Sequence, residues 1–125
     1  MKLEKNRIFS TILFLPYLVI IIAGCANPIH DVPFSVNSAP PGSYVLLQTM
    51  IPEMDMYDWV YMGTTPVDFV REMNFKELKK AESISLRILK EGYFEQTKSW
   101  LSDDFIDHYD DKGGISWDPH LVPMK

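Results

Sequence analysis

Hydrophobic and polar residues alternate over several short segments, the pattern of β-strands that bury one face. The alternation is clearest where Ile84, Leu86 and Ile88 are interleaved with Ser85 and Arg87. Aromatic and aliphatic residues also predict strands over 34–38, 43–49, 59–61, 67–70 and 93–100. Because turns rich in proline and glycine separate these segments, we expect a mainly β fold, a small antiparallel β-sandwich.

Two segments between the predicted strands do not alternate in this way. Residues 50–58 contain a proline and three acidic residues, and we expect them to form a hairpin loop. Residues 72–82 place Phe75 and Leu78 on one helical face, which predicts one or two helical turns. A helix this short is marginal without packing, so it needs a hydrophobic surface to lie on.

The first 24 residues have the pattern of a secretion signal. Lys2, Lys5 and Arg7 precede an apolar run of 16 residues from Ile8 to Ala23, with Pro16 in its middle. A membrane-spanning helix needs roughly 20 apolar residues, and no cluster of basic residues follows this run as a stop-transfer signal. A cleaved signal peptide is therefore predicted, with an uncleaved anchor helix as the alternative.

The end of the apolar run resembles the lipobox of bacterial lipoproteins. Ile22, Ala23 and Gly24 stand directly before Cys25, as an aliphatic residue and two small residues do in that motif. The resemblance implies cleavage after residue 24 and acylation of the Cys25 thiol, so that lipid holds the protein on a membrane. Because Ala26 rather than aspartate follows, it also implies the outer membrane in a Gram-negative host. In a Gram-positive host it implies the outer face of the plasma membrane.

Composition narrows the classes of function. The whole chain of 125 residues has a net charge of −5. The 101 residues from Cys25 onward carry nine basic and sixteen acidic side chains, a net charge of −7. An acidic domain is not attracted to phosphate backbones, so nucleic-acid binding is not expected. Cys25 is the only cysteine, so no intrachain disulfide stabilises this one small domain.

Three turn motifs, taken in order, resemble those of PEGA domains. They are Ser38-Ala39-Pro40-Pro41-Gly42-Ser43, then Gly63-Thr64-Thr65-Pro66, then Gly92-Tyr93. The resemblance implies a β-rich accessory module of envelope proteins without catalytic residues, and it assigns structural turn positions to Pro41, Gly42, Gly63, Thr65, Pro66, Gly92 and Tyr93. We therefore divide the chain into a signal peptide (1–24), a tether (25–33), a PEGA-like β domain (34–100) and an acidic C-terminal tail (101–125).

The acidic tail carries the densest group of candidate metal ligands, Asp103, Asp104, Asp107, His108, Asp110 and Asp111. Carboxylates suit hard cations such as calcium, but the run lacks the spacing, internal glycine and final glutamate of an EF-hand loop. We expect a solvated acidic surface, with a cation site as the alternative. A zinc site is not predicted, because His30, His108 and His120 lie on separate segments.

No catalytic residue and no cofactor is predicted. Ser102, His108 and the nearby aspartates are the residue types of a hydrolase triad, but a triad is defined by its geometry. The Gly-x-Ser-x-Gly elbow is absent. Glycoside cleavage by a pair of carboxylates stays an alternative, although so small a domain leaves little room for a deep cleft. A small cation-dependent hydrolase is therefore the least favoured class.

Many aromatic side chains are present for so short a chain: Tyr57, Trp59, Tyr61, Tyr93, Phe94, Trp100, Phe105, Tyr109 and Trp117. We expect most of them to fill the core, and any that face outward to form a patch for a protein or a glycan. Residues 117–121 are a candidate cover over the sheet. The sequence thus predicts a non-catalytic, lipid-anchored envelope lipoprotein that acts as a protein-interaction or scaffolding module. A wall-polysaccharide-binding module is the alternative, and a contiguous exposed aromatic face would favour ligand binding over scaffolding.

Overall fold

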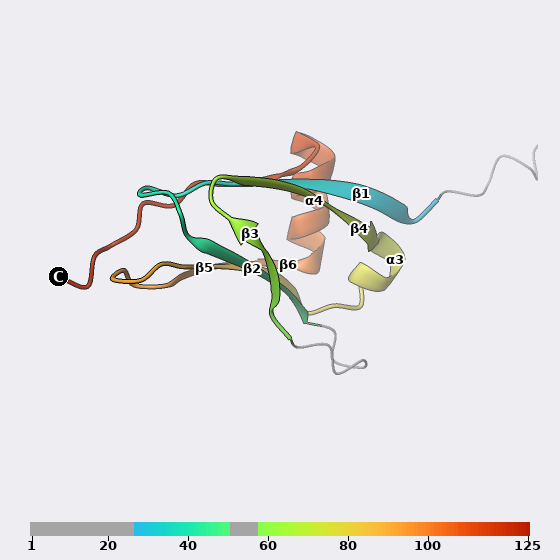
Figure 1. The fold of residues 1–125 in the computed structure, drawn as a ribbon. Helices are drawn as coiled ribbons and strands as arrows, with labels where there is room; N and C mark the ends of the chain where they lie inside the picture. Colours follow the sequence, from blue (N-terminus) through green and yellow to red (C-terminus); the bar gives the residue numbers. More distant parts are fainter. Residues whose placement is uncertain (1–26, 51–57) are drawn as a thin grey trace, which may run out of the picture.

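The computed structural model describes residues 27–50 and 58–125 (Figure 1). The predicted signal peptide, Cys25 and most of the expected loop, with Tyr57, lie outside these residues. The described chain forms two sheets packed face to face, which confirms the predicted mainly β sandwich. None of its helices is long and apolar enough to cross a membrane.

One sheet has three strands in the order β4-β1-β7, and the other has four in the order β3-β2-β5-β6. Neighbouring strands are antiparallel except β1 and β7, which are parallel. The predicted strands are present, although β4 is longer than expected and β6 begins later. The bounds are β1 (Ile29–Val36), β2 (Tyr44–Met50), β3 (Val60–Thr64), β4 (Val67–Asn74), β5 (Ser83–Leu89), β6 (Gln96–Leu101) and β7 (Ile115–Trp117).

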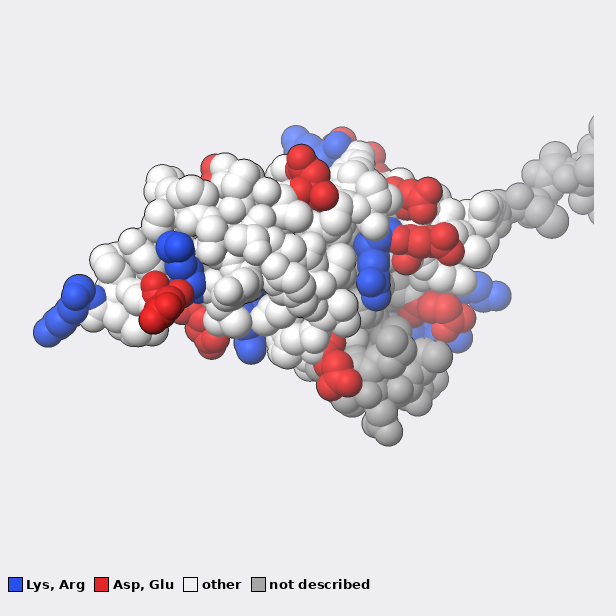
Figure 2. Space-filling view, in the orientation of Figure 1, with Lys and Arg blue, Asp and Glu red and all other residues white. Residues whose placement is uncertain are grey.

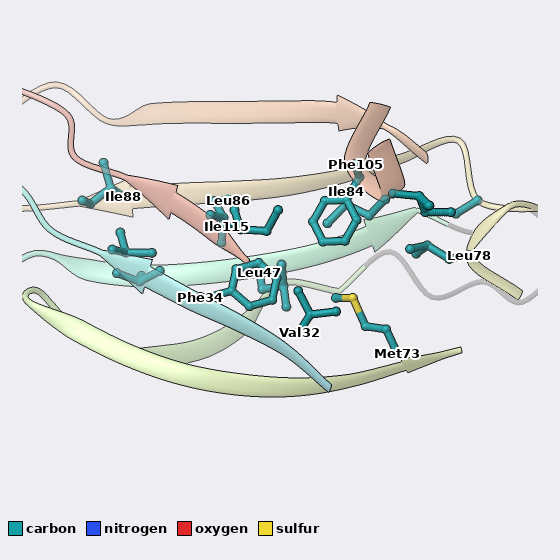
Figure 3. Packing of buried hydrophobic residues seen from close by; sticks show 14 of the residues in the cluster. Val32, Phe34, Leu47, Met73, Leu78, Ile84, Leu86, Ile88, Phe105 and Ile115 are labelled. Atoms are coloured by element: carbon teal, nitrogen blue, oxygen red, sulfur yellow. The ribbon is translucent and has the colours of Figure 1, made fainter. Parts of the chain in front are cut away.

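The core lies between the two sheets, and alternation along the strands builds it. Val32, Phe34 and Val36 of β1 point inward and are almost completely buried, whereas Pro33 and Ser35 between them are exposed. On β5 the alternating Ile84, Leu86 and Ile88 are fully buried and meet them from the other sheet (Figure 3). Burying a side chain of this size contributes about 1.5–3 kcal/mol, so these strands supply a large share of the stability.

The acidic residues after β6 form a helix, which corrects the predicted tail over 101–125. Helix α4 (Ser102–Lys112) buries Phe105 completely, against Phe34 at 6.1 Å and Trp100 at 6.0 Å between ring centroids. Phe105, Ile106 and Tyr109 share one helical face, and the aspartates occupy the rest. Aspartate is a poor helix former in isolation, so packing of this apolar face outweighs local propensity. Strand β7 then joins β1, and the domain therefore includes the C-terminal segment.

The predicted tether over 25–33 is also shorter than expected, because β1 already begins at Ile29. The two prolines of this segment suggested irregular chain, yet Pro33 lies within the strand, opposite Val70 of β4. Strand β7 pairs only with the last three residues of β1, from Phe34 onward. Pro33 thus lies just before the ladder with β7 begins, where a missing N–H is tolerated.

The short helix predicted within 72–82 is present as α3 (Phe75–Leu78). The Asn74 side chain accepts from the N–H groups of Lys76 and Glu77 at 3.0 and 3.3 Å, which caps the first turn. Phe75 and Leu78 are both buried, so the helix closes the end of the sandwich at which β1 begins.

The chain crosses between the sheets twice at the opposite end, and two of the predicted turn motifs make these crossings. Residues 37–43 lead from β1 to β2, and Thr65–Pro66 leads from β3 to β4; the Ala39–Pro40 and Thr65–Pro66 bonds are both cis. Gly63 has a φ of 137°, and a Cβ there would lie 2.8 Å from a Val67 methyl group. Only glycine fits this position without a shift of its neighbours.

Three buried hydroxyl groups tie the two crossings together, those of Ser38, Ser43 and Thr65. Thr65 Oγ1 accepts from the Gly42 and Ser43 N–H groups at 3.1 and 2.9 Å. With both acceptor sites filled, Thr65 donates its proton to Ser38 Oγ at 2.7 Å. Ser38 Oγ in turn donates to the Pro40 carbonyl at 2.7 Å, so the Ser43 hydroxyl, 3.1 Å away, donates to Ser38. We call this group the hydroxyl tie.

Replacing Thr65 by valine tests the hydroxyl tie. Thr65→Val keeps the shape of the side chain but removes the acceptor of the Ser43 N–H, which is buried. Leaving such a donor unpaired costs about 1–3 kcal/mol, so the urea midpoint measured by tryptophan fluorescence should fall accordingly. Thr97→Val, an exposed change on β6, is the matched control and should alter the free energy of unfolding by under about 0.5 kcal/mol. Equal effects of the two substitutions would contradict the tie.

Candidate functional site

We call the end of the sandwich at which residue 125 lies the C-terminal pole (Figure 1). A hollow between three chain segments lies at this pole. Tyr44, the first residue of β2, pairs with Leu89, the last of β5. The turn with Gly92 and Tyr93 follows, and the Met124 N–H donates to the Gly92 carbonyl at 2.9 Å. The hollow has a volume of about 470 Å³. Apolar and aromatic side chains line it together with the charged Lys90, Glu91 and Glu95.

Large hydrophobic side chains are exposed around this hollow. Tyr44, Phe94, Val122 and Met124 are each 53–56% exposed. Leu89 and Tyr93 beside them are half-buried, and Tyr93 packs against the core. Scattered exposed hydrophobic residues are common, but a contiguous group of them marks a binding surface. We call Tyr44, Leu89, Phe94, Val122 and Met124 the pole surface.

The pole surface continues onto the edge strand β3 through a pair of tyrosines. The rings of Tyr44 and Tyr61 meet edge to face, with centroids 5.9 Å apart. The Tyr61 hydroxyl shares a hydrogen bond with Thr64 Oγ1 at 2.8 Å, which holds the ring in place. Val60 beside it is also exposed. Figure 2 shows a broad area without charged side chains over the middle of this side of the molecule, where β3 lies.

The three tryptophans, in contrast, are all packed against other side chains. The Arg87 guanidinium lies 4.1 Å above the Trp59 ring, close enough for a cation–π interaction. Trp100 contacts Phe105 edge to face, and Trp117 packs against the core. The expectation that most aromatic residues fill the core therefore holds for Trp100, Phe105, Tyr109 and Trp117, whereas Tyr61 and Phe94 face solvent.

A second hollow, of about 860 Å³, lies on the outer face of the three-stranded sheet. Its floor includes Ser35 and Ser116, which face each other across the β1–β7 pair. His108 and Lys112 of α4 and Asp68 of β4 also line it. These polar and charged side chains lie among apolar ones, such as the half-buried Phe69 and the exposed Val70.

The aspartates of α4 do not converge on one point. Asp103, Asp104, Asp107, Asp110 and Asp111 are all exposed on the helix. Among residues 27–50 and 58–125, no group of three or more histidine, cysteine, aspartate or glutamate side chains is arranged to hold a metal ion. The geometry is that of a solvated acidic face.

The residue types of a hydrolase triad are likewise apart. Ser102 and His108 both lie on α4, and six residues of helix separate them by about 9 Å along its axis. His30 stacks on Phe75 with ring centroids 4.3 Å apart, at the other end of the sandwich from His120. Across the described residues these groups make no nucleophile–base contact.

The predicted turn residues take two kinds of position. Pro41, Gly42, Gly63, Thr65 and Pro66 lie at the sheet crossings. Gly92 and Tyr93 form the β5–β6 turn and line the pole hollow. Sequence reasoning missed Tyr44, Val122 and Met124 as surface residues. Because Val45 and Leu47 alternate with their neighbours, the sequence could have predicted that Tyr44 faces outward. No local pattern predicts that Val122 and Met124 lie on the same surface.

In comparisons with known proteins, no family model, no curated protein and no solved structure matches this chain. The likeness to PEGA domains therefore remains a prediction that rests on three turn motifs.

Proposed function

We propose that this protein is a non-catalytic, lipid-anchored component of the bacterial cell envelope that binds another envelope protein at its C-terminal pole. The observation that carries the proposal is the pole surface, five neighbouring hydrophobic residues of which four are more than half exposed. In a Gram-negative host the outer membrane is the expected location, because Ala26 follows the acylated cysteine.

The position of the pole relative to Cys25 supports this role. Strand β1 begins at Ile29, four residues after the cysteine, and runs for eight residues toward the pole. At roughly 3.3 Å per residue the strand spans about 26 Å. A lipid on Cys25 would therefore attach the protein by the end at which β1 begins, and the pole surface would face away from that membrane.

The composition of the pole surface favours a protein partner. Tyrosine, phenylalanine and methionine are enriched in the centres of protein interfaces, where charged residues are depleted. The hollow is lined by one lysine and two glutamates, whereas the negative charge of the domain is concentrated in the five aspartates of α4. An uncharged, apolar segment of a partner protein could bind this surface without burying the aspartates of α4.

A glycan-binding module is the second candidate, and the exposed Tyr44–Tyr61 pair favours it. Aromatic rings that project from a surface can stack on the apolar face of a sugar. The tryptophans, however, do not provide such platforms: Arg87 covers one face of Trp59, and the other two pack inward. The aliphatic Leu89, Val122 and Met124 fit a protein better than a sugar.

Removing the thiol tests the anchor. In cells labelled with radioactive palmitate, Cys25→Ser should abolish incorporation of label, since the thiol is the group that accepts the lipid. Gly24→Ala, which keeps a small residue before the cysteine, should leave labelling intact. Label on the Cys25→Ser protein, or wild-type protein without fatty-acid mass, would contradict the anchor.

A photo-crosslinking residue in place of Glu95, which lines the hollow, tests the docking site in native membranes. We expect a discrete protein adduct that the same residue in place of Thr97 does not form. Tyr44→Ala should reduce this adduct about 30-fold, the effect of losing a contact worth about 2 kcal/mol. Val70→Ala, an equally exposed apolar change on β4, should not.

The proposal would be contradicted by a Glu95 adduct that is insensitive to Tyr44→Ala, or by no adduct at all. An adduct that mass spectrometry identifies as a polysaccharide would replace the protein partner by the glycan.

A further inference from the structure

The last eight residues, 118–125, run from one sheet to the other across the C-terminal pole, and we call them the strap. On the side of the three-stranded sheet, the Ala39 N–H donates to the Pro119 carbonyl at 3.1 Å, and the Leu121 N–H donates to the Ala39 carbonyl at 2.9 Å. The Gln96 side chain adds a hydrogen bond to the His120 carbonyl at 2.8 Å. The strap is thus seated by main-chain hydrogen bonds rather than by a covalent link.

On the other side, the strap pairs with the β5–β6 turn. The Phe94 N–H donates to the Val122 carbonyl, and the Met124 N–H donates to the Gly92 carbonyl, both at 2.9 Å. Between these bonds Tyr93 and Pro123 face each other as an antiparallel pair. The strap therefore pairs with the turn through one isolated antiparallel bridge.

Burial along the strap is uneven. Pro119 and Leu121 are buried, whereas residues 122–125 are all exposed. Segments held by a few exposed hydrogen bonds open at much lower free energy than core strands. We therefore expect the part of the strap beyond Leu121, which is exposed and held by two main-chain hydrogen bonds, to open without unfolding of the sandwich.

This weakly held part supplies two members of the pole surface, Val122 and Met124, and Met124 lines the hollow. When the strap leaves its seat, the hollow loses one wall and the exposed apolar surface is divided. Docking at the pole thus depends on a segment that two exposed main-chain hydrogen bonds hold in place.

We propose that the strap is a conformational switch for docking: seated, it completes the binding surface, and released, it takes the surface apart. The inference rests on the proposed function, since it concerns the same pole. Because linkage is reciprocal, a bound partner also holds the strap in its seat. Anything that pulls residues 122–125 from their seat or removes them would then weaken docking.

A disulfide that locks the strap tests this switch. Tyr93 and Pro123 form a non-hydrogen-bonded antiparallel pair, whose Cα atoms are typically about 4.5 Å apart, within the range of a disulfide. The double variant Tyr93→Cys/Pro123→Cys is studied in the full-length, membrane-anchored protein. Its reduced form is the matched control, because it carries the same two substitutions without the lock.

Two readouts are taken on this variant. In hydrogen exchange, we expect the Phe94 and Met124 amides of the reduced form to exchange at least tenfold faster than those of Ile84, Leu86 and Ile88. The lock should slow them at least tenfold. With the photo-crosslinking residue at position 95, the locked form should give at least threefold more adduct than the reduced form, since a preorganised surface binds more tightly.

A truncation gives an independent arm. Deleting residues 122–125 should reduce the position-95 adduct at least tenfold, whereas deleting Lys125 alone should leave it unchanged. Equal adduct from locked and reduced forms, or Phe94 and Met124 amides that exchange as slowly as those of β5 before locking, would overturn the switch and leave the docking site standing. Absence of any adduct in the wild type would overturn the proposed function and the switch together.

Discussion

Three hydroxyl groups at the C-terminal pole set the arrangement on which the rest of the structure depends. Two of the crossings between the sheets occur there, and Ser38, Ser43 and Thr65 join these two through hydrogen bonds. No buried side-chain nitrogen or oxygen in the described ranges lacks a partner. These hydrogen bonds therefore fix one corner of the sandwich without a disulfide. Hydrophobic packing between the apolar faces of the strands holds the rest of the two sheets together.

The candidate binding surface is built outward from this corner. Tyr44 directly follows Ser43, and Tyr61 reaches Tyr44 from the strand that leads to Thr65. The strap is hydrogen-bonded to Ala39, within the first crossing. The frame around the hydroxyl tie thus positions tyrosines from two strands and the seat of the C-terminal segment. The proposed switch would add one movable wall to this frame.

The features of the fold that depend on neighbouring residues in the sequence were predictable from it. Alternation located the strands and the inward-facing residues of β5, and the proline and glycine motifs located the turns. The acidic run from Asp103 to Asp111 concealed α4, because its helicity depends on Phe105 meeting Phe34 and Trp100 from distant strands. The hydroxyl tie was beyond prediction for the same reason, since Ser38 and Thr65 are 27 residues apart. The pole surface likewise joins three segments that only the fold brings together.

A double-mutant cycle between Ser38→Ala and Thr65→Val tests the tie most directly. Urea unfolding of the wild type, both single variants and the double variant gives the coupling energy between the two hydroxyl groups. Because the groups share one hydrogen-bond network, the double variant should lose less stability than the two single variants combined, by about 1 kcal/mol or more. Losses that add within about 0.3 kcal/mol would show two independent turns, and the hydroxyl groups would then not fix the corner of the sandwich.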